Sequence, residues 1–558
     1  MLIIIIYLLI ILILTPIIGA YLFKVFTDSS FFGKKLFSNF EHRIYAFIGV
    51  DPLKEQTWKS YLISLLVFNL LGFTLLFLIL VFQGYLPMNP QGLKCVEWHL
   101  ALNIATSFVT NTNWQSYAGE TTLSNFSQMV GLTVQNFMSA ATGIGVLLAL
   151  ARSFTKKSVQ TLGNFWVDST RATIYVFLPL SILLAIGLVS QGVVQTFQAN
   201  LPVETIMGST QELPLGPAAS QIAIKQLGTN GGGFYNANSA HPFENPTPFS
   251  NLLQMLAILI IPAALTITYG KIVGSYKHGI VVFGVMMFLL ICGIAVSWYA
   301  ENDLAHTWGG LANFEGKELR LGIDNSVLWS LITTAASNGS VNCMHSSLAP
   351  LAGLVAMFNI MLGEVVFGGV GSGLYGMILF IIITVFIAGL MVGRTPEYLG
   401  KKIESFEVQM AMVAVLSPSV VILAFSALAI QTTAGTSSLL SHGPHALSEI
   451  VYAFTSAAGN NGSAFAGLNA NTAFYNVLLA LAMAIGRFGV IVPVMALAGS
   501  MVKKKSTPVS LGTFKTDNLL FACLLLAVMM VVGGLTFFPV LALGPVVEHI
   551  GLSTSILF

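Results

Sequence analysis

Charged residues are scarce in this chain: Asp, Glu, Lys and Arg together make up 8% of its 558 residues. By contrast, 55% of the sequence is hydrophobic and its mean hydropathy is +0.82. A soluble protein does not need so much apolar surface, whereas membrane-spanning helices need uncharged runs of about 20 residues. The lack of charge therefore excludes an ordinary soluble protein and predicts an all-α polytopic membrane protein.

Signatures of catalysis and of cofactor binding are also missing. The four cysteines are scattered and form no CxxC pair, which excludes the common zinc motifs. The sequence has no GxxxxGK[ST] loop and no HExxH motif, and no loop is long enough for a nucleotide-binding domain. We therefore expect no enzyme, no nucleotide bound by this chain and no nucleic acid partner. If the chain takes part in uphill transport, another subunit must supply the energy.

Ten apolar runs predict ten transmembrane helices. They lie near 3–24, 62–82, 129–151, 172–195, 250–270, 278–300, 351–393, 410–430, 474–500 and 519–542. The first run lacks a basic start and a small-residue cleavage site, so we expect a retained helix rather than a signal peptide. The seventh run is too long for one straight span.

Basic residues alternate between the loops that join these runs. The loops 24–60, 152–171, 271–277, 394–402 and 503–515 hold 19 of the 24 Lys and Arg residues. The other four loops, 83–128, 196–249, 301–350 and 431–473, hold only four. Because basic loops stay in the cytoplasm, we expect the poorly basic loops and both termini to be external.

Each expected external loop contains one short polar cluster. The clusters read TNTN (110–113), TNGG (229–232), SNGS (337–340) and NNGS (460–463). Aligned on a shared Asn in the second place, at 111, 230, 338 and 461, they recur at intervals of 119, 108 and 123 residues. Such a period indicates four repeats of helix, re-entrant pore loop and helix. A short apolar stretch before each cluster predicts a pore helix whose negative C-terminal end faces the cluster.

These repeats give the expected division of the chain. It comprises 1–60 (first helix and cytoplasmic loop), 61–152, 171–271, 278–394 and 409–501 (repeats 1 to 4), and 519–558 (last helix and external tail).

The clusters suit a filter for a monovalent cation. Non-helical backbone at membrane depth is tolerated only where protein buries it or it lines a watery path. Four loops around one axis would offer a ring of carbonyls that replaces the hydration shell of the ion, and Gly accepts the positive φ that this geometry needs. No Asp or Glu lies in the clusters, which favours monovalent over divalent ions. One such cluster alone would be an ordinary Asn- and Gly-rich turn.

Three further features bear on the ion path. The segment GEVVFGGVGSGLYG (363–376), with Gly369 and Gly371, should break the seventh helix in mid-membrane and form a gating loop, unless its small residues serve helix packing. Arg487 lies inside a span, so we expect a partner, Glu364, and a role as a barrier or gate; a purely structural pair is the alternative. Gln115 is expected to bond the filter backbone or an entering ion, or to support the filter as scaffold.

Several long motifs resemble one family. TNTNWQSY, GTNGGGF, NSAHPFENPT, GEVVFGGVGSGLYGM, GRTPEYLGKKI, NNGSAFAGL and GRFGVI look like the potassium-binding A subunits of Kdp potassium-transporting ATPases. The resemblance runs from about residue 55 to the C-terminus and implies the fold of the potassium-channel-like transporter superfamily. It also implies high-affinity K⁺ uptake across the bacterial inner membrane, with a P-type ATPase subunit (B) and small accessory membrane subunits (C and F) as partners. In the family, K⁺ passes from the A subunit through an intramembrane tunnel to the ATPase subunit.

The resemblance also implies a set of K⁺-binding positions. They are Asn111 and Thr112; Thr229, Asn230 and Gly231; Ser337, Asn338 and Gly339; and Asn460, Asn461 and Gly462. Gln115 matches a position tied to ion affinity, and Glu364 and Arg487 match positions below the filter. Some members carry Cys where this chain has Asn338, which permits a backbone role there but not a side-chain role.

Two other classes of transporter are alternatives for this sequence. A channel-like K⁺ translocator gated by a cytosolic nucleotide-binding ring would use the same filter but would not block passage below it. A secondary transporter would show inverted repeats, whereas the repeats here share one orientation.

Overall fold

The computed structural model describes residues 1–558 except 28, 32, 304–311, 394, 507–513 and 554–558. The end of the expected external tail and parts of the expected loops 301–350 and 503–515 thus lie outside the described residues. The described chain is helical, with ten helices long and apolar enough to cross a membrane. The predicted all-α, ten-helix fold class is confirmed.

The ten spans follow the predicted apolar runs. They are α1 (Leu2–Phe26), α3 (Trp58–Val81), η2 with α6 (Ser127–Thr155), α7 to α8 (Phe165–Ser190), α10 (Pro248–Ile272), α11 (Tyr276–Asn302), α14 (Ser372–Val392), α15 (Ser405–Gln431), α18 (Ala473–Met501) and α19 to α20 (Leu519–Leu552). Shorter helices are α2 (Lys34–Ile48), α5 (Gly119–Thr122), α13 (Pro350–Met361) and α16 (Thr433–Thr436).

Four pore helices lie between paired spans. They are α4 (Trp98–Val109), α9 (Ala218–Leu227), α12 (Gly322–Ala335) and α17 (Gly443–Gly459). The pairs around them are α3 and α6, α8 and α10, α11 and α14, and α15 and α18. Each unit is therefore a helix, a pore loop and a helix, as the repeats predict.

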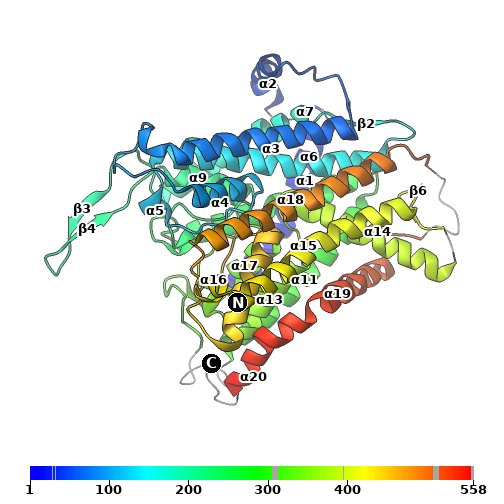
Figure 1. The fold of residues 1–558 in the computed structure, drawn as a ribbon. Coiled ribbons are helices and arrows are strands. Elements are labelled where there is room, and N and C mark those ends of the chain that lie inside the picture. Colours follow the sequence, from blue (N-terminus) through cyan, green and yellow to red (C-terminus); the bar gives the residue numbers. More distant parts are fainter. Residues whose placement is uncertain (28, 32, 304–311, 394, 507–513, 554–558) are drawn as a thin grey trace.

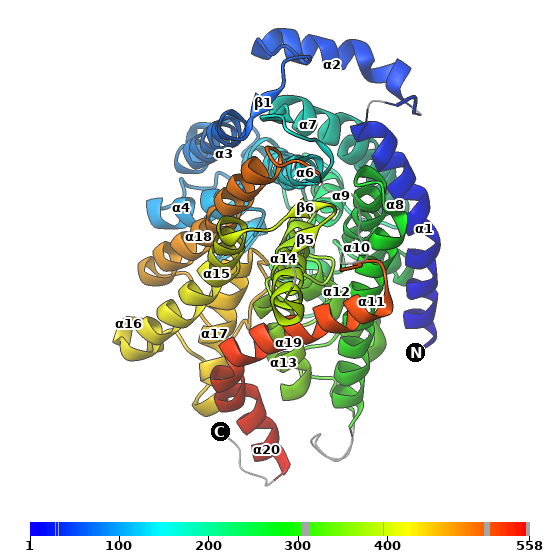
Figure 2. The ribbon, with the colours of Figure 1, turned by 90° about the vertical axis from the view of Figure 1, so that its right-hand side faces the viewer.

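The second helix of each repeat is more buried than the first. The buried share of the most apolar stretch rises from 28% to 83% between α3 and α6, and from 39% to 83% between α8 and α10. It rises from 39% to 67% between α11 and α14, and from 28% to 50% between α15 and α18. Seen along the helices, α6, α10, α14 and α18 surround the centre (Figure 2). The second helices thus form the inner layer around the pore loops.

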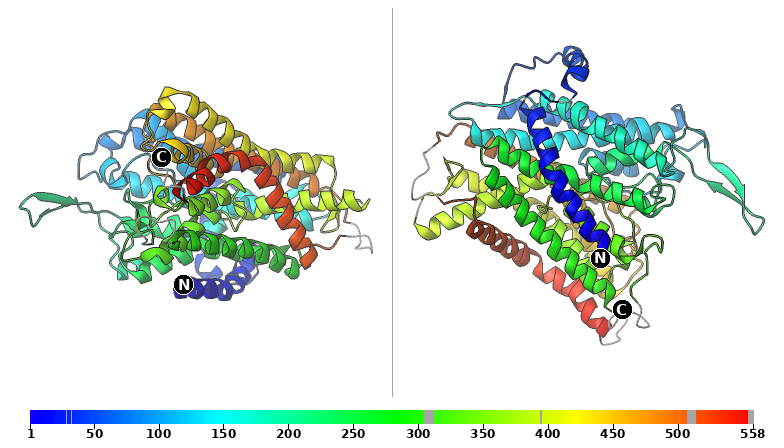
Figure 3. Two further views of the ribbon diagram at one scale, coloured as in Figure 1. Left: turned by 90° about the horizontal axis from the view of Figure 1, so that it is seen from below. Right: turned by 180° about the vertical axis from the view of Figure 1, so that it is seen from behind.

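The remaining two spans pack on the outside of this arrangement. From behind, α1 runs obliquely across the outside of the bundle (Figure 3), where it packs on α10. Close packing there depends on Gly19, because a Cβ atom at this position would lie 2.8 Å from the carbonyl oxygen of Ala264. On another side, α19 lies across α11, α13 and α14 (Figure 2).

The seventh apolar run is broken, as its glycines predict. Helix α13 ends at Met361 and α14 begins at Ser372. Gly371 has a φ of +87°, and a Cβ atom there would lie 2.2 Å from the carbonyl oxygen of Gly143 on α6. The broken segment therefore fits only because a glycine lets the backbones of two repeats touch.

Short hairpins mark the two ends of the bundle. The hairpin β3 (Leu201–Glu204) with β4 (Thr210–Leu213) projects from one end, and β5 (Glu397–Tyr398) with β6 (Lys401–Lys402) lies at the other (Figure 1). A third pair joins β1 (Gln56–Thr57) to β2 (Thr161–Gly163). The N-terminus contacts Asp324 at the start of α12, so it lies on the side of the pore-helix loops.

At the end of the bundle that carries β5 and β6, a buried lysine joins the ends of two helices. The ammonium of Lys401 donates to the carbonyl oxygens of Ser153 and Met501, each at 2.7 Å. These residues belong to the last turns of α6 and α18, where carbonyls lack helical partners. One side chain thereby ties the inner helices of repeats 1 and 4 together.

Candidate functional site: a ring of four pore-loop segments

The four polar clusters share an alternating backbone. After each pore helix come three residues, of which the first and third have positive φ: Asn111 and Asn113, Thr229 and Gly231, Ser337 and Gly339, and Asn460 and Gly462. The residue between them, here called the middle residue, has no positive φ; it is Thr112, Asn230, Asn338 or Asn461. Alternation of positive and negative φ turns successive carbonyls toward one side, which suits a carbonyl-lined ion path.

Backbone hydrogen bonds correct the sequence alignment by one residue in the first cluster. The middle N–H of each segment bonds the carbonyl oxygen five residues earlier: Thr112 to Ser107 (2.9 Å), Asn230 to Lys225 (2.9 Å), Asn338 to Thr333 (3.0 Å) and Asn461 to Ser456 (2.9 Å). Thr112, and not Asn111, is therefore equivalent to the other three Asn residues. The alignment on a shared Asn failed because Asn tolerates positive φ and here occupies the positions on both sides of Thr112.

Side-chain hydrogen bonds join the four segments into a closed ring. The links are Asn111 Nδ2 to Thr229 O (3.0 Å), Asn338 Nδ2 to Lys225 O (3.1 Å), Ser337 Oγ to Asn460 O (2.9 Å) and Asn460 Nδ2 to Thr112 Oγ1 (3.0 Å). They connect segment 1 to segment 2, segment 3 to the end of pore helix α9 in repeat 2, segment 3 to segment 4, and segment 4 back to segment 1. Stretches more than 100 residues apart in the sequence thus meet around one axis, as the repeats predict.

Direct backbone contact around the ring explains the three glycines. A Cβ atom at Gly231, Gly339 or Gly462 would lie 1.4, 2.1 or 2.0 Å from the carbonyl oxygen of Asn338, Asn461 or Thr112 in the next segment. In the first segment Asn113 takes this place, and its Nδ2 donates to Gly231 O at 2.9 Å. Any larger residue at the three glycines would push neighbouring segments apart.

At one level of the ring, all four carbonyls lack a donor. The middle residues are buried, and no hydrogen bond among the described residues ends on their carbonyl oxygens. At the levels on either side, Thr229 O, Gly231 O and Asn460 O accept side-chain hydrogen bonds. Buried carbonyls without a donor are costly, so this level, here called the carbonyl ring, is the candidate cation site.

Gln115 lies just beyond the first segment and bonds the second. Its Nε2 donates to Gly233 O at 2.9 Å and its Oε1 accepts from Gly233 N at 2.8 Å. Both ends of the amide are therefore engaged by backbone. Of the roles expected from the sequence, the geometry supports that of a scaffold residue, which bonds the backbone two residues beyond the second segment.

The broken segment between α13 and α14 lies against the face of the ring at which the pore helices end. Val370 N, between Gly369 and Gly371, donates to Thr229 Oγ1 at 2.9 Å. Gly368 N donates to Ala335 O, at the end of the third pore helix, also at 2.9 Å. The Gly-rich segment thus contacts pore loops 2 and 3 directly.

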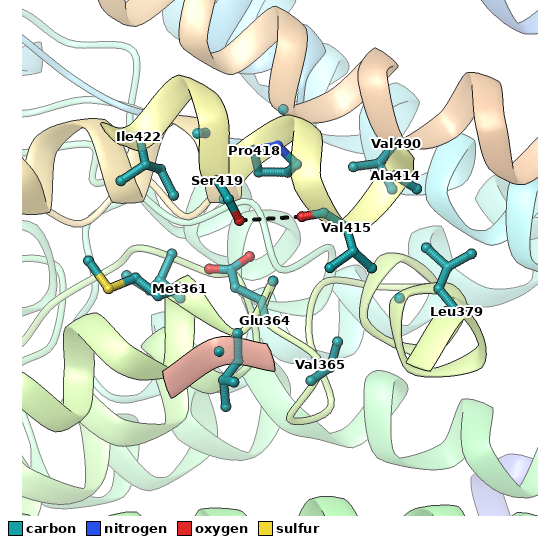
Figure 4. Close-up of a pocket in the computed structure, with 18 of the residues that line it drawn as sticks. Met361, Glu364, Val365, Leu379, Ala414, Val415, Pro418, Ser419, Ile422 and Val490 are labelled. Atoms are coloured by element: carbon teal, nitrogen blue, oxygen red, sulfur yellow. Dashed lines mark hydrogen bonds between the residues drawn. The ribbon is translucent and has the colours of Figure 1, made fainter. Parts of the chain in front are cut away.

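A cavity of about 80 Å³ opens at the inner end of the fourth segment. Residues of α14, α15, α18 and α19 line it together with Asn460, Glu364 and Arg487. The Glu364 carboxylate points into the cavity toward Ser419 and Pro418 of α15 (Figure 4). Its Oε1 accepts from Asn461 Nδ2 at 2.8 Å, so one asparagine connects the carbonyl ring to the cavity acid.

Arg487 and its predicted partner Glu364 form no direct ion pair. No salt bridge among the described residues joins them, although both line the same cavity. Arg487 instead donates from Nη2 to the carbonyl oxygen of Ser139 on α6 at 3.1 Å, while Asn461 provides the donor to Glu364. The two charges therefore face the cavity separately.

Comparison with known proteins places these features in a family. The model of the potassium-transporting ATPase A subunit family matches residues 5–550. A potassium-transporting ATPase potassium-binding subunit from Leptospira interrogans is 55% identical over 546 residues, 98% of this chain and 97% of its own length. One of the same description from Pseudomonas aeruginosa is 53% identical over 542 residues, 96% of each chain. A crystal structure of the potassium transporter TrkH from Vibrio parahaemolyticus aligns with 14% identity and a TM-score of 0.49, over 74% of this chain and 82% of that one. The chain belongs to the family of potassium-transporting ATPase A subunits.

Proposed function

We propose that this chain selects K⁺ at the external side of an ATP-driven uptake complex and binds it at the carbonyl ring. The observation that carries the proposal is the ring itself, in which four buried carbonyls at one level lack a donor among the described residues. The relatives in the same family are named potassium-binding subunits. Carbonyls arranged in this way replace the water shell of a monovalent cation.

The four pore helices support the binding of a positive charge. Each ends directly before a filter segment or one residue before it, with its last residue at Val109, Leu227, Ala335 or Gly459. The C-terminal end of a helix carries about half a negative charge. Four such ends directed at one ring favour a cation without any carboxylate in the filter.

The proposed ion path continues from the ring into the cavity beside Glu364. Several features support a block to direct passage beyond it: the Gly-rich segment lies against the ring, Arg487 adds a positive charge to the cavity wall, and Lys401 ties the opposite helix ends together. In this proposal the ion leaves the cavity sideways, to a P-type ATPase subunit that hydrolyses ATP. Small accessory subunits complete a complex in the bacterial inner membrane, with both termini of this chain external.

Two glycines with the same backbone angle provide the test. Gly231 and Gly208 both have a φ of +76°, but a Cβ atom meets Asn338 O at 1.4 Å at Gly231 and nothing within 4 Å at Gly208. Because both substitutions impose the same backbone strain, only Gly231→Ala should disturb the ring. We expect Gly231→Ala to raise the K⁺ concentration for half-maximal ATP hydrolysis by about tenfold or more, the equivalent of about 1.4 kcal/mol.

The measurement uses the purified complex, with Na⁺ in place of K⁺ as ion control. Gly208→Ala should retain the wild-type K⁺ dependence. An ATPase that does not copurify, hydrolysis that ignores K⁺, or equal effects of both substitutions would overturn the proposal. The first two results would favour a channel-like translocator with a separate nucleotide-binding ring.

A further inference from the structure

The second pore helix carries a buried charge for which the ion path has no evident use. The side chain of Lys225 is 1% exposed and forms an ion pair with Glu244, which is 0% exposed. The same ammonium donates to the carbonyl oxygen of Gly232, the residue directly after the second filter segment, at 2.7 Å. A buried charge persists only when it is paired and hydrogen-bonded, and here one of its partners is the outer end of the filter.

Residues 225 and 244 bond the backbone on both sides of Gly232, the first also through its main chain and the second through its side chain. The carbonyl oxygen of Lys225 accepts from the N–H groups of Asn230 and Gly231 at 2.9 and 3.0 Å. Beyond the segment, Glu244 Oε2 accepts from the N–H groups of Phe234 and Tyr235 at 3.1 and 3.3 Å. The main-chain bond to the middle residue recurs in the other repeats, whereas the side chains of Lys225 and Glu244 hold Gly232, Phe234 and Tyr235.

The same place in the other repeats lacks a charge. The residues five before the middle residue on those pore helices are Ser107, Thr333 and Ser456. At the level of Gly232, Trp114 O accepts from Ser107 Oγ at 3.1 Å and Ser340 O accepts from Trp329 Nε1 at 2.8 Å. These carbonyls are thus bound by pore-helix side chains, but only repeat 2 uses an ammonium, which makes the stronger, charge-assisted hydrogen bond.

We propose that Lys225 is a positioning residue for ion selection, which holds the Gly232 carbonyl away from the ion and thereby ends the filter at Gly231. Glu244 balances its charge, so the pair acts through geometry and adds no net repulsion at the mouth. With Gly232 O fixed, the first carbonyl of segment 2 that the ion can meet is that of Gly231, directly outside the carbonyl ring. Without Lys225, segment 2 gains freedom and the ring loses its fit to one ion size. This inference rests on the proposed function.

A second buried Lys–Glu pair supplies the matched control. The side chains of Lys317, in the loop before the third pore helix, and Glu301, at the end of α11, are both 0% exposed and form an ion pair at 2.9 Å. Lys317 also approaches the carbonyl oxygens of Glu315 and Ser347, and in the described part of the chain it donates to no filter segment. Replacement of either lysine by Met leaves a buried carboxylate without its cation, but only one replacement frees a filter carbonyl.

The experiment measures ATP hydrolysis by the purified whole complex as a function of KCl, RbCl and NaCl. We expect Lys225→Met to raise the half-maximal K⁺ concentration about tenfold, the scale of one charge-assisted hydrogen bond. The preference for K⁺ over Rb⁺ and Na⁺ should narrow, while the maximal rate should stay within about twofold, because the path below the ring is untouched. Lys317→Met should leave the ion preference unchanged.

Lys225→Met alone could prevent assembly of the complex because it leaves the Glu244 carboxylate unpaired. A double variant avoids this problem. In Lys225→Met with Glu244→Gln no charge is left unpaired, but the donor to Gly232 is still lost, so this double variant should show the same loss of preference. Either Lys225 variant, assembled and with wild-type ion preference, would overturn the inference, as would an equal shift in Lys317→Met. If Gly231→Ala alters K⁺ dependence and Lys225→Met does not, only this inference fails; if neither does, the proposed function fails as well.

Discussion

At the scale of single residues, Asn461 performs three tasks at once. Its carbonyl belongs to the carbonyl ring, its Oδ1 accepts from Ser463 N at 3.0 Å, and its Nδ2 donates to Thr333 O at 2.9 Å and to Glu364 Oε1 at 2.8 Å. The amide thus supplies an acceptor to its own segment and a donor to the third repeat and the cavity acid. A residue that fits this place needs a donor and an acceptor on one short side chain, which Asn provides.

Asn461→Asp should destabilise the complex by about 3 kcal/mol, the usual effect of leaving a buried charge uncompensated. The substitution keeps the shape but removes the donor to Thr333 and Glu364, and it places two acids side by side. The midpoint of heat unfolding of the purified complex measures the effect. The control is Asn469→Asp, because Asn469 is exposed and its Oδ1 only accepts from Asn471 N; an equal loss in both variants would contradict the account.

At the scale of elements, the outer helices are held by different forces. Helix α1 packs closely on α10: Thr268 Oγ1 donates to Gly19 O at 3.1 Å, and a Cβ atom at Gly19 would lie 2.8 Å from Ala264 O. At the C-terminal end of the described chain, a polar contact joins His445 Nδ1 on α17 to Glu548 Oε1 on α20, at 2.8 Å. The contact of α1 with α10 depends on close packing, whereas the contact of α17 with α20 depends on the protonation of His445.

Gly19→Val should cost about 1–3 kcal/mol, because added methyl groups overpack a closed interface. Gly284→Val is the matched change, since Gly284 also lies inside a helix, α11, and a Cβ atom added there would meet nothing within 4 Å. Urea or heat unfolding of the purified complex compares the two. The account predicts a loss for Gly19→Val that clearly exceeds that for Gly284→Val, and equal losses would refute it.

The docking of α20 should weaken as the pH rises. Burial disfavours the charged imidazole of His445, but the hydrogen bond and charge of Glu548, with the charges of Glu449 and Glu315, outweigh it and raise the pKa of His445 above its usual value. A raised pKa in the folded state contributes stability that is complete below the unfolded pKa of about 6.5 and is lost as the pH rises through the folded pKa.

Hydrogen exchange of Val547–Ser553, corrected for the intrinsic effect of pH, should therefore show less protection at about pH 8 than at about pH 6. His445→Gln should remove this difference, whereas His42→Gln, at an exposed position on α2, should preserve it. Protection that is independent of pH in the wild type would exclude a protonated His445 as the contact.

At the scale of the whole molecule, the sequence predicted what repeats and periodicity encode. Hydropathy gave the ten spans, the four clusters gave the pore loops, and the glycines after Glu364 gave the break before α14. Contacts between repeats were harder to predict from the sequence. Asn111 shifted the alignment of the first cluster by one residue, and Arg487 bonds Ser139 instead of Glu364. Both depend on how four distant segments meet, which spacing along the chain does not specify. Lys225 was missed, although its place among Ser107, Thr333 and Ser456 was a readable signal.

The position of the bound ion tests the account most directly. Crystals of the whole complex grown with Rb⁺ in place of K⁺ would locate the ion by anomalous scattering. The account predicts the strongest peak inside the ring formed by the carbonyl oxygens of Thr112, Asn230, Asn338 and Asn461, and its loss in Gly231→Ala. A strongest peak in the cavity beside Glu364, with none in the ring, would contradict the central claim that these four carbonyls select the ion.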